Sequence, residues 1–380
     1  MSMEIKGGMN MKQELKTNKE HVETSFGLAR NKGITLVALI ITIIVLLILA
    51  VVAISAVSGN GILNHAQNAK TQYSEAQQNE QEMLSKYEYE LEKSQGKVQT
   101  YGEYVINKEL NEKYPGLKLG DQINYSVDGY TSMMWNVIGI ENGELLLAGS
   151  AKTEFMMSNS SDSVWDEQTK SFKTLEEKMN EACQKYLNTQ YATKARNMTM
   201  EDVNKITGYD KTTYVSADGI KYGDKVTYKL VNGKINYKIN SGEYTETSTP
   251  GFKAPLAESK LEEGEEYEVE NTYFSYDAAE KCGISKESKL YKIMFENAGY
   301  YLSSSAINAI NGGYANFSMG YISGSKVQYN TIYNSVNMGG GIMGYLRPVV
   351  QLKSDIELVR KLWDMDDSGK INEFNNIIIS

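Results

Sequence analysis

Residues 34–57 read ITLVALIITIIVLLILAVVAISAV, and no charged residue interrupts this run. At a helical rise of about 1.5 Å per residue the run spans about 36 Å, more than the roughly 30 Å hydrocarbon core of a bilayer. The run therefore predicts a transmembrane helix. It separates a short leader, residues 1–33, from a much longer polar part of the chain.

The charges on either side of the run predict its orientation. Arg30 and Lys32 precede it closely, whereas the first cation after it is Lys70. Because positive residues stay on the cytoplasmic side, we expect a single-pass protein of the cell membrane with a cytoplasmic N-terminus and an extracellular bulk. The run is longer than the apolar core of a cleaved secretory signal, about 7–15 residues, so we expect the helix to be retained.

The junction before the run carries a family resemblance. Lys32-Gly33 followed by Ile34 resembles the type IV prepilin signal, in which a prepilin peptidase cleaves after the glycine and methylates the new N-terminus. The resemblance implies that Gly33 is the cleavage-site residue and Ile34 the first mature residue. At the fifth mature position Ala38 replaces the family's usual glutamate, which would pair with a neighbouring subunit during assembly. This departure favours a minor pilin or pseudopilin over a repeating subunit, and an uncleaved signal anchor remains the alternative.

Residues 58–97 predict a stalk helix. Two glycines around Asn60 favour a break after the membrane helix, and Gly96 favours the end of the stalk. Apolar residues recur between them at helical spacing. They are Leu63, Ala66, Ala69, Tyr73, Ala76, Met83, Tyr87 and Leu91. We expect this apolar stripe to seat the head or to contact neighbouring subunits, with a short coiled-coil linker as the alternative.

Beyond the stalk we expect an extracellular head at residues 98–355, and the amino-acid composition indicates its character. The formal net charge is −9, which argues against nucleic acid as a partner because such binding needs a basic face. The chain has 27 tyrosines against 8 phenylalanines. Tyrosine is enriched in strands and on half-exposed surfaces, so we predict a β-rich head and an α+β class for the whole protein.

Local patterns place the first elements of this head. Short apolar runs predict strands at 104–106, 122–127, 135–140 and 145–148. Asn142-Gly143 predicts a hairpin turn between the last two. We expect a helix at 174–191, and Thr199 with Asp202 has the pattern of a capping box that starts a second helix.

Residues 209–275 look like an insertion. Alternating runs at 226–230 and 235–239 flank Asn232-Gly233 and predict a β-hairpin. The acidic run at 259–270 is expected to be a solvated loop or sheet edge, without a function of its own.

The last part of the head carries a second resemblance. Tyr300-Tyr301-Leu302 begins one predicted strand, further strands follow at 314–322 and 327–332, and residues 344–352, GYLRPVVQL, form a final one. This order resembles a surface domain common in Firmicutes, itself similar to the C-type-lectin-like fold of formylglycine-generating enzymes. Trp135 matches the early tryptophan strand of the same domain. The resemblance covers 300–352 well and 100–352 loosely, and it implies a fold and a Gram-positive surface but no activity.

The side chains available for chemistry are few. The only histidines, His21 and His65, lie outside the head, which excludes Ser-His-Asp and Cys-His catalysis and the usual zinc sites there. We therefore predict that the protein is not an enzyme. Outside the membrane, Cys183 and Cys282 could form a disulfide or remain free. Arg347 could bind an anion, but its place in a core-like strand favours a buried arginine that pairs with a carboxylate.

The C-terminal tail, residues 356–380, contains a candidate calcium site. Residues 364–375, DMDDSGKINEFN, place oxygen ligands, a glycine and an aliphatic residue as a calcium loop does, and they resemble EF-hand and dockerin loops. The candidate ligands are Asp364, Asp366, Ser368, Lys370, Asn372 and Asn375. Asn375 replaces the bidentate acid of such loops, so we expect weak affinity, or else a plain acidic turn. Residues 356–362 are expected to form the entering helix.

These features predict a prepilin-like, membrane-anchored surface protein. It would be a minor subunit of a type IV pilus or of a type II secretion-like system, with an adhesive or ligand-binding head. The implied partners are the membrane, a prepilin peptidase, other pilin-like subunits and an extracellular ligand that the sequence does not identify. The alternatives are an uncleaved single-pass protein whose head binds a cell-wall or glycan ligand, and a membrane-anchored enzyme, which the lack of histidines disfavours.

Overall fold

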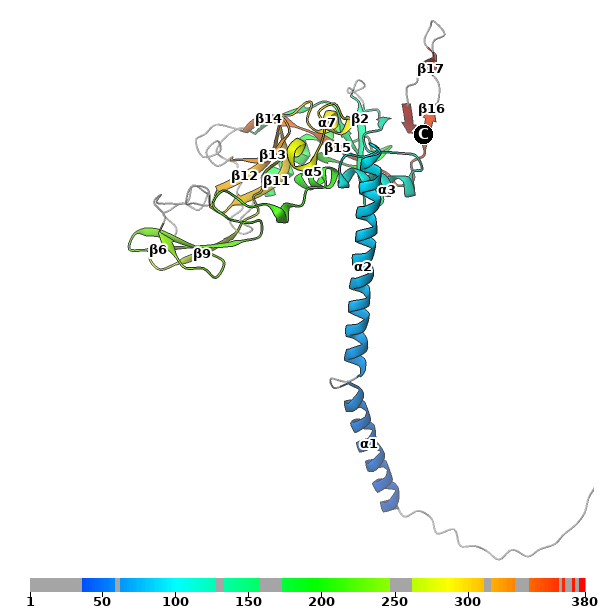
Figure 1. Cartoon of the computed structure of the whole chain (residues 1–380), viewed down its shortest axis with the longest axis vertical. Helices are drawn as coiled ribbons and strands as arrows, with labels where there is room; N and C mark the ends of the chain where they lie inside the picture. Colours follow the sequence, from blue (N-terminus) through cyan, green and yellow to red (C-terminus); the bar gives the residue numbers. More distant parts are fainter. Residues whose placement is uncertain are drawn as a thin grey trace, which may run out of the picture. The chain divides into compact units, whose positions relative to one another are not determined.

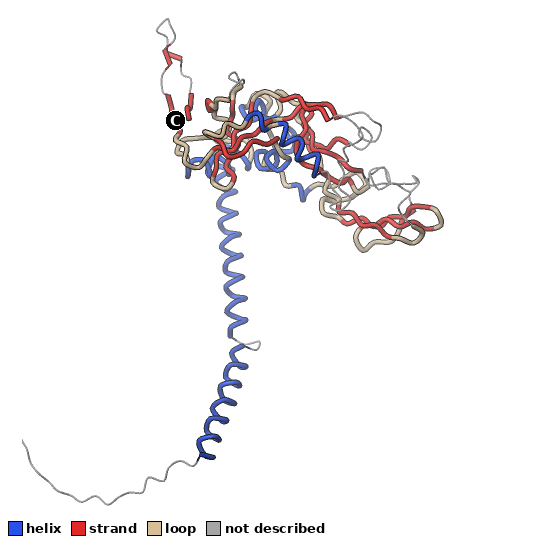
Figure 2. The backbone as a smooth tube through the Cα atoms, turned by 180° about the vertical axis from the view of Figure 1, so that it is seen from behind, coloured by secondary structure: helices blue, strands red, loops and turns tan. Residues whose placement is uncertain are grey.

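The computed structural model describes residues 36–58, 62–127, 133–157, 173–246, 262–310, 316–331, 342–361, 364–365, 371–372 and 376–379. The predicted mixed α+β class is confirmed, since a sheet-rich body accompanies a small number of helices. The chain forms two compact units, Met1–Glu80 and Gln81–Ser380. The strands all belong to the second unit, where Figure 2 draws them in red.

Two long helices open the described chain (Figure 1). α1 is Leu36–Ser58 and α2 is Ile62–Ser94. The break predicted around Asn60 lies outside the described residues. α1 has no charged residue, and the apolar side chains described along it are exposed, with Leu46 at 65% and Val51 at 61%. Judged by length and apolarity together, no helix within the described ranges qualifies as a membrane span.

The last turns of α2 contact the head through a tyrosine outside the predicted stripe. Tyr89 is buried with Val98 and Tyr104, and its ring lies edge-on to that of Tyr101 at 5.5 Å. The Tyr104 hydroxyl donates to the Glu88 carboxylate. In contrast, the described members of the apolar stripe stay exposed, with Tyr87 at 72%. Tyr89, and not the stripe, therefore seats the head on α2.

The predicted strand at 104–106 is wrong, because this segment lies in helix α3, Tyr101–Lys113. Thr100 caps the helix by accepting a hydrogen bond from Glu103 N, and the Glu103 carboxylate accepts one from Gln99 N. Ile106 and Leu110, four residues apart, then face the main hydrophobic core, while Tyr104 packs with Tyr89 and Val98. The three apolar residues that suggested a strand are one turn of this helix.

A seven-stranded sheet forms the first layer of the head, in the order β16-β19-β1-β2-β3-β15-β5. Its strands are β16 Leu358–Lys361, β19 Asn376–Ile379, β1 Gln122–Asn124, β2 Trp135–Glu141, β3 Glu144–Gly149, β15 Pro348–Leu352 and β5 Ala192–Asn197. The pairs are antiparallel except β1 with β19. Asn142 and Gly143 have φ of 51° and 78°, as a tight hairpin turn requires, so the predicted β2–β3 hairpin is confirmed.

A second, six-stranded sheet has the order β10-β13-β12-β11-β14-β4. Its strands are β10 Tyr276–Asp277, β13 Lys326–Thr331, β12 Asn316–Ser323, β11 Tyr300–Asn308, β14 Ile342–Leu346 and β4 Thr153–Met157. The predicted single strand at 344–352 is wrong, because β14 and β15 belong to different sheets and Arg347 lies between them. One hydrophobic core, which includes Leu147 of the first sheet and Ile322 of the second, unites both layers.

The insertion forms a small sheet of its own, in the order β8-β7-β6-β9. Its strands are β8 Thr245–Glu246, β7 Lys234–Ile239, β6 Lys225–Val231 and β9 Glu266–Glu270. The predicted β6–β7 hairpin is confirmed. The described end of the acidic run forms edge strand β9, where Lys225 meets Glu268 at 3.0 Å and Lys229 meets Glu266 at 3.2 Å.

Short helices complete the head. They are α4 Lys173–Ala182, η1 Gln184–Tyr186, α5 Met200–Thr207, η2 Lys211–Thr213, α6 Ala278–Cys282 and α7 Lys289–Met294. The capping box of Thr199 and Asp202 at the start of α5 is confirmed. The helix predicted at 174–191 is shorter, since α4 ends at Ala182 and β5 begins ten residues later at Ala192.

The predicted entering helix at 356–362 is wrong, because Leu358–Lys361 form strand β16. β16 pairs with β19, and β19 pairs with β1, which lies about 250 residues earlier in the chain. Between β16 and β19 in the sequence, β17 Asp364–Met365 and β18 Ile371–Asn372 pair with each other. Strand pairing across the sheet edge, which no local pattern encodes, decides the conformation of this tail.

Candidate functional site

A cleft of about 1090 Å³ opens in the second unit beside α3, α5 and β11. Five aromatic residues line it, and we call it the tyrosine cleft after them: Tyr101, Tyr209, Tyr222, Phe274 and Tyr329. Six charged residues also line it: Glu82, Lys86, Glu201, Lys205, Asp210 and Lys211. A concave surface that mixes aromatic rings with a few polar groups is the usual form of a ligand site.

The aromatic rings of the cleft are held by contacts with one another. Tyr209 stacks on Tyr276 with centroids 3.7 Å apart and planes 8° from parallel. Tyr222 and Tyr329 both meet Phe274 edge-on, at 5.9 Å and 5.5 Å. Phenols are neutral at physiological pH, and burial raises the pKa of Tyr209 and of Tyr329 further. The rings therefore present a fixed, uncharged surface.

The charged side chains of the cleft differ in how they are paired. Lys86 binds Glu82 at 2.7 Å, and Lys205 binds Glu109 at 3.0 Å. Asp210 accepts hydrogen bonds from the Thr212 hydroxyl and backbone N–H, which lower its pKa.

Two charged groups of the cleft remain available. Within the described ranges, neither the Glu201 carboxylate nor the Lys211 ammonium has a hydrogen bond or an ion pair. The Lys211 ammonium lies 4.7 Å from the ring centroid of Tyr222, where the negative face of the ring attracts it. The cleft thus offers one free acceptor and one free donor beside an aromatic ring.

Close backbone packing of α3 against α5 forms one wall of the cleft. A Cβ on Gly102 would lie 2.1 Å from Lys205 O, so only glycine allows the two helices to approach this closely. Gly208 ends α5 with φ of 70°, and it also faces Gly102. Thr100 adds a hydrogen bond from its hydroxyl to Ile206 O at 3.0 Å. These contacts fix the helix that carries Glu201, Asn204 and Lys205 into the cleft.

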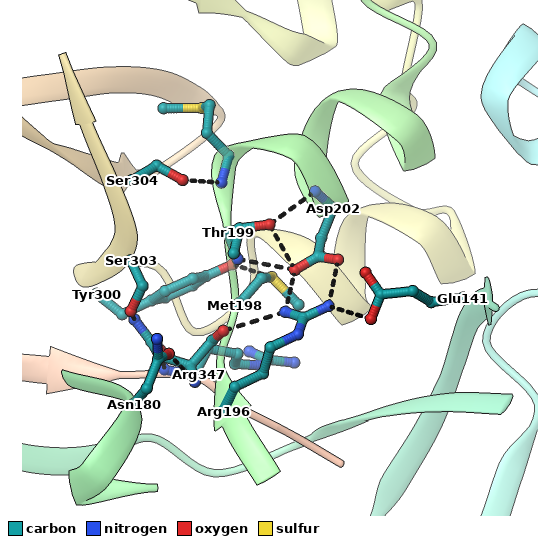
Figure 3. Close-up of polar contacts among 12 residues, drawn as sticks. Glu141, Asn180, Arg196, Met198, Thr199, Asp202, Tyr300, Ser303, Ser304 and Arg347 are labelled. Atoms are coloured by element: carbon teal, nitrogen blue, oxygen red, sulfur yellow. Dashed lines mark hydrogen bonds and ion pairs between the residues drawn. The ribbon is translucent and has the colours of Figure 1, made fainter. Parts of the chain in front are cut away.

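A buried polar network holds the start of α5 (Figure 3). Arg196 donates to both carboxylate oxygens of Asp202, at 2.6 Å and 2.9 Å, and lies 3.8 Å from Glu141. Burial disfavours the charged Arg196, but these carboxylates outweigh it and raise its pKa. The Asp202 carboxylate also accepts from Thr199 N. One ion pair and one helix cap therefore share the same aspartate.

Asn197 extends the network into the second sheet. Its side-chain amide donates to Tyr301 O at 3.0 Å and to the Ser303 hydroxyl at 3.2 Å, and its side-chain oxygen accepts from Arg347 N at 2.8 Å. Nearby, the Ser304 hydroxyl accepts from Met200 N at 2.9 Å. Since Met200 starts α5 and Ser304 lies on β11, this network fixes two walls of the tyrosine cleft relative to each other.

Arg347 is buried, as predicted, but no carboxylate among the described residues pairs with it. Its side chain is 1% exposed, it donates to Ile293 O, and the guanidinium lies 5.6 Å from the Tyr300 ring centroid. Burial lowers its pKa. Nε and Nη1 have no hydrogen-bond partner within the described part of the chain. A carbonyl and an aromatic face replace the carboxylate because Arg347 lies where the chain passes from one sheet to the other.

The predicted processing and calcium residues are described only in part. Gly33 and Ile34 lie outside the described residues, as do Asp366, Ser368, Lys370 and Asn375. Asp364 and Asn372 are direct partners across β17 and β18. Among described residues, no group of three or more His, Cys, Asp or Glu could hold a metal ion. Calcium binding therefore stays a prediction, since only two of the six candidate ligands are described and these two are neighbours across a strand pair.

The two cysteines are free thiols, so of the two alternatives left open by the sequence the disulfide is not formed. Cys183 is fully buried in the core next to α4, and burial raises its pKa to about 12. Cys282 ends α6, and its thiol contacts the Thr207 hydroxyl of α5. Burial raises its pKa to about 11. Packing on different elements keeps the two sulfurs unpaired, and the raised pKa values make both thiols poor nucleophiles.

Comparisons with known protein families, with curated proteins and with solved structures find no match for this chain.

Sequence reasoning missed the tyrosine cleft. Its rings come from positions as far apart as Tyr101 and Tyr329, and no local pattern joins them. The available signal was the excess of tyrosine, which predicted half-exposed surfaces but not their location.

Proposed function

We propose that this chain is a prepilin-like, membrane-anchored surface protein whose head binds an extracellular ligand in the tyrosine cleft. The observation that carries the anchor is the uncharged run 34–57 directly after Lys32-Gly33. α1 covers this run from Leu36 onward and leaves its described apolar side chains exposed, which suits a lipid environment better than water. Ala38 at the fifth mature position favours a minor pilin or pseudopilin.

The C-type-lectin-like fold belongs to the same proposal. Its support is that Trp135 is fully buried on β2 and that residues 300–352 contribute the consecutive strands β11 to β15. The tyrosine cleft supports a binding role for the head, because its rings are held in place while Glu201 and Lys211 remain available. The head has no histidine, and its thiols are buried or protonated, so we propose binding and not catalysis.

Mass analysis of the mature N-terminus tests the anchor. The full chain would be produced in a Gram-positive host that has a prepilin peptidase and recovered from its membranes. We expect a first residue Ile34 that carries one methyl group. Gly33→Asn should abolish cleavage, whereas Gly27→Ala, elsewhere in the leader, should leave it unchanged. An intact leader on a membrane-bound protein would favour the uncleaved single-pass alternative. Recovery in the cytosol without lipid association would contradict both.

A further inference from the structure

We infer that the tyrosine cleft binds a neutral oligosaccharide. This inference rests on the proposed binding role of the head and names the chemical class of its ligand. Three properties of the cleft lead to it: its balance of charge, its fixed aromatic rings and its size.

Charge balance argues for a neutral ligand. The cleft carries Lys86, Lys205 and Lys211 against Glu82, Glu201 and Asp210, three charges of each sign. A polyanion would meet the unpaired carboxylate of Glu201, and a polycation would meet the ammonium of Lys211. A ligand rich in hydroxyl groups has no such conflict, since each hydroxyl both donates and accepts.

The aromatic rings suit the apolar faces of sugar rings. Pyranose rings present C–H groups on one face, and these pack against the negative face of an aromatic ring. Tyr209 and Tyr222 are only partly buried, so their rings contribute surface to the cleft. The stack of Tyr209 on Tyr276 keeps one ring from rotating, which lowers the entropy lost on binding.

Polar groups beside these rings complete the site. α5 places Glu201 and Asn204 on the cleft. The Asn204 side-chain oxygen accepts from the Tyr276 hydroxyl at 3.0 Å, which directs its amide N–H groups elsewhere. Within the described residues this amide donates to no other group. The Glu201 carboxylate can accept hydrogen bonds from sugar hydroxyls, and the Asn204 amide and the Lys211 ammonium can donate hydrogen bonds to them.

The size of the cleft indicates a chain of sugars. At about 1090 Å³ it slightly exceeds the range of about 300–1,000 Å³ typical of sites for small molecules. One sugar would leave most of the aromatic surface uncovered, whereas several linked units would cover it.

Titration calorimetry of the full-length protein in detergent micelles tests this inference. The probes are cellohexaose, hexa-N-acetylchitohexaose and maltohexaose, each titrated separately. We expect saturable binding of at least one. Tyr222→Ala should then weaken it at least about fivefold, because stacking is lost. Tyr222→Phe should retain most of the affinity. Glu201→Gln, an exposed substitution that does not endanger the fold, should also weaken it. Tyr73→Ala on α2, an exposed tyrosine outside the cleft, should change nothing.

Three results would overturn the inference. One is the absence of saturable binding by all three probes. The second is binding that Tyr222→Ala and Glu201→Gln leave unchanged in variants whose thermal unfolding matches that of the parent. The third is salt-sensitive binding of poly(glycerol phosphate) in place of the sugars, which would show an anion site. None of these results alters the N-terminal mass analysis, so failure of the ligand class is distinct from failure of the proposed anchor.

Discussion

Arg196 and Asp202 show how much depends on a single buried pair. Their side chains are 9% and 10% exposed, and Asp202 also completes the capping box of α5. Loss of one partner leaves the other charge buried without compensation. The same carboxylate therefore stabilises the fold and positions the cleft residues that follow it on α5.

We predict that Asp202→Asn destabilises the second unit by about 3–5 kcal/mol, because the remaining guanidinium keeps only the Asn197 carbonyl and the distant Glu141 carboxylate. Urea unfolding of the full chain in detergent, followed by tryptophan fluorescence, measures this loss. Glu268→Gln is the control, since its ion pair with Lys225 is exposed and should contribute less than about 1 kcal/mol. Similar losses in the two variants would contradict the assigned role of the buried pair.

A second residue makes stability depend on pH. Burial raises the pKa of Glu176, although hydrogen bonds from Ser305 oppose the shift. A carboxyl with a raised folded pKa favours folding below its unfolded pKa, about 4.5, and this contribution is lost as pH rises through the folded value.

We therefore predict that Glu176→Gln gains stability relative to the parent as pH rises from 4.5 to 7.5, because the glutamine never has to carry a buried charge. Each unit of pKa displacement corresponds to about 1.4 kcal/mol. Thermal unfolding at both pH values measures the difference. Glu181→Gln, an exposed change on the same helix, serves as control. If the difference in stability between Glu176→Gln and the parent were the same at both pH values, the raised pKa of Glu176 would be refuted.

At the scale of elements, the crossing of α3 and α5 depends on one glycine. We predict that Gly102→Ala costs about 1–3 kcal/mol, because the new methyl group would overlap the Lys205 and Ile206 carbonyls and force the helices apart. The same separation should reshape the tyrosine cleft and weaken any ligand bound there. Chemical denaturation gives the first effect and titration calorimetry the second.

Gly219→Ala is the control for this crossing. At Gly219 φ is +80° and no atom lies within 4 Å of a new Cβ, so only backbone strain is introduced. We expect a loss of about 1 kcal/mol and unchanged ligand binding. If Gly102→Ala proved as mild as this control, the close approach of α3 and α5 would not be essential.

The C-terminal tail, whose sequence pattern predicted a calcium loop, contributes strands to the first sheet. β19 pairs with β1 and with β16, and Ile379 is 7% exposed. We predict that removal of residues 356–380 destabilises the second unit by several kcal/mol, because β1 loses its outer neighbour. Differential scanning calorimetry should show a lower unfolding temperature. The control is Asp364→Asn, which preserves β-strand pairing and should shift the unfolding temperature by less than about 2 °C in the absence of calcium. A truncated protein with the unfolding temperature of the parent would contradict the role of this strand pairing.

At the scale of the whole molecule, the proposal divides the chain into an anchor and a head. Residues 34–57 have no charge, whereas every ion pair described in the structure lies beyond Glu80. Such a division separates apolar surface for lipid from polar surface for water.

We predict that the parent protein resists alkaline carbonate extraction from membranes, and that the double change Leu46→Lys and Leu47→Lys makes it extractable. Each lysine at the centre of a membrane helix opposes insertion by about 2.5–3.5 kcal/mol. Immunoblots of pellet and supernatant measure the partition. Leu46→Ile with Leu47→Ile preserves the apolar character and should remain in the pellet. Extraction of the parent itself would rule out the anchor.

The sequence by itself determined the features that short-range chemistry controls. The turns at Asn142 and Asn232 and the Thr199 capping box all followed from glycine, asparagine and threonine at defined offsets. Each depends on the backbone preferences of a few adjacent residues, which the chain carries in any context.

Only the tertiary structure decided the rest. Residues 104–106 became helical through a cap and a core contact, β16 became a strand through β19, and Arg347 received a carbonyl and a ring in place of a carboxylate. The tyrosine cleft likewise gathers Tyr101 and Tyr329 from distant positions. In each case the deciding partner lies far along the chain, and only the packing of the sheets and helices brings it within contact distance.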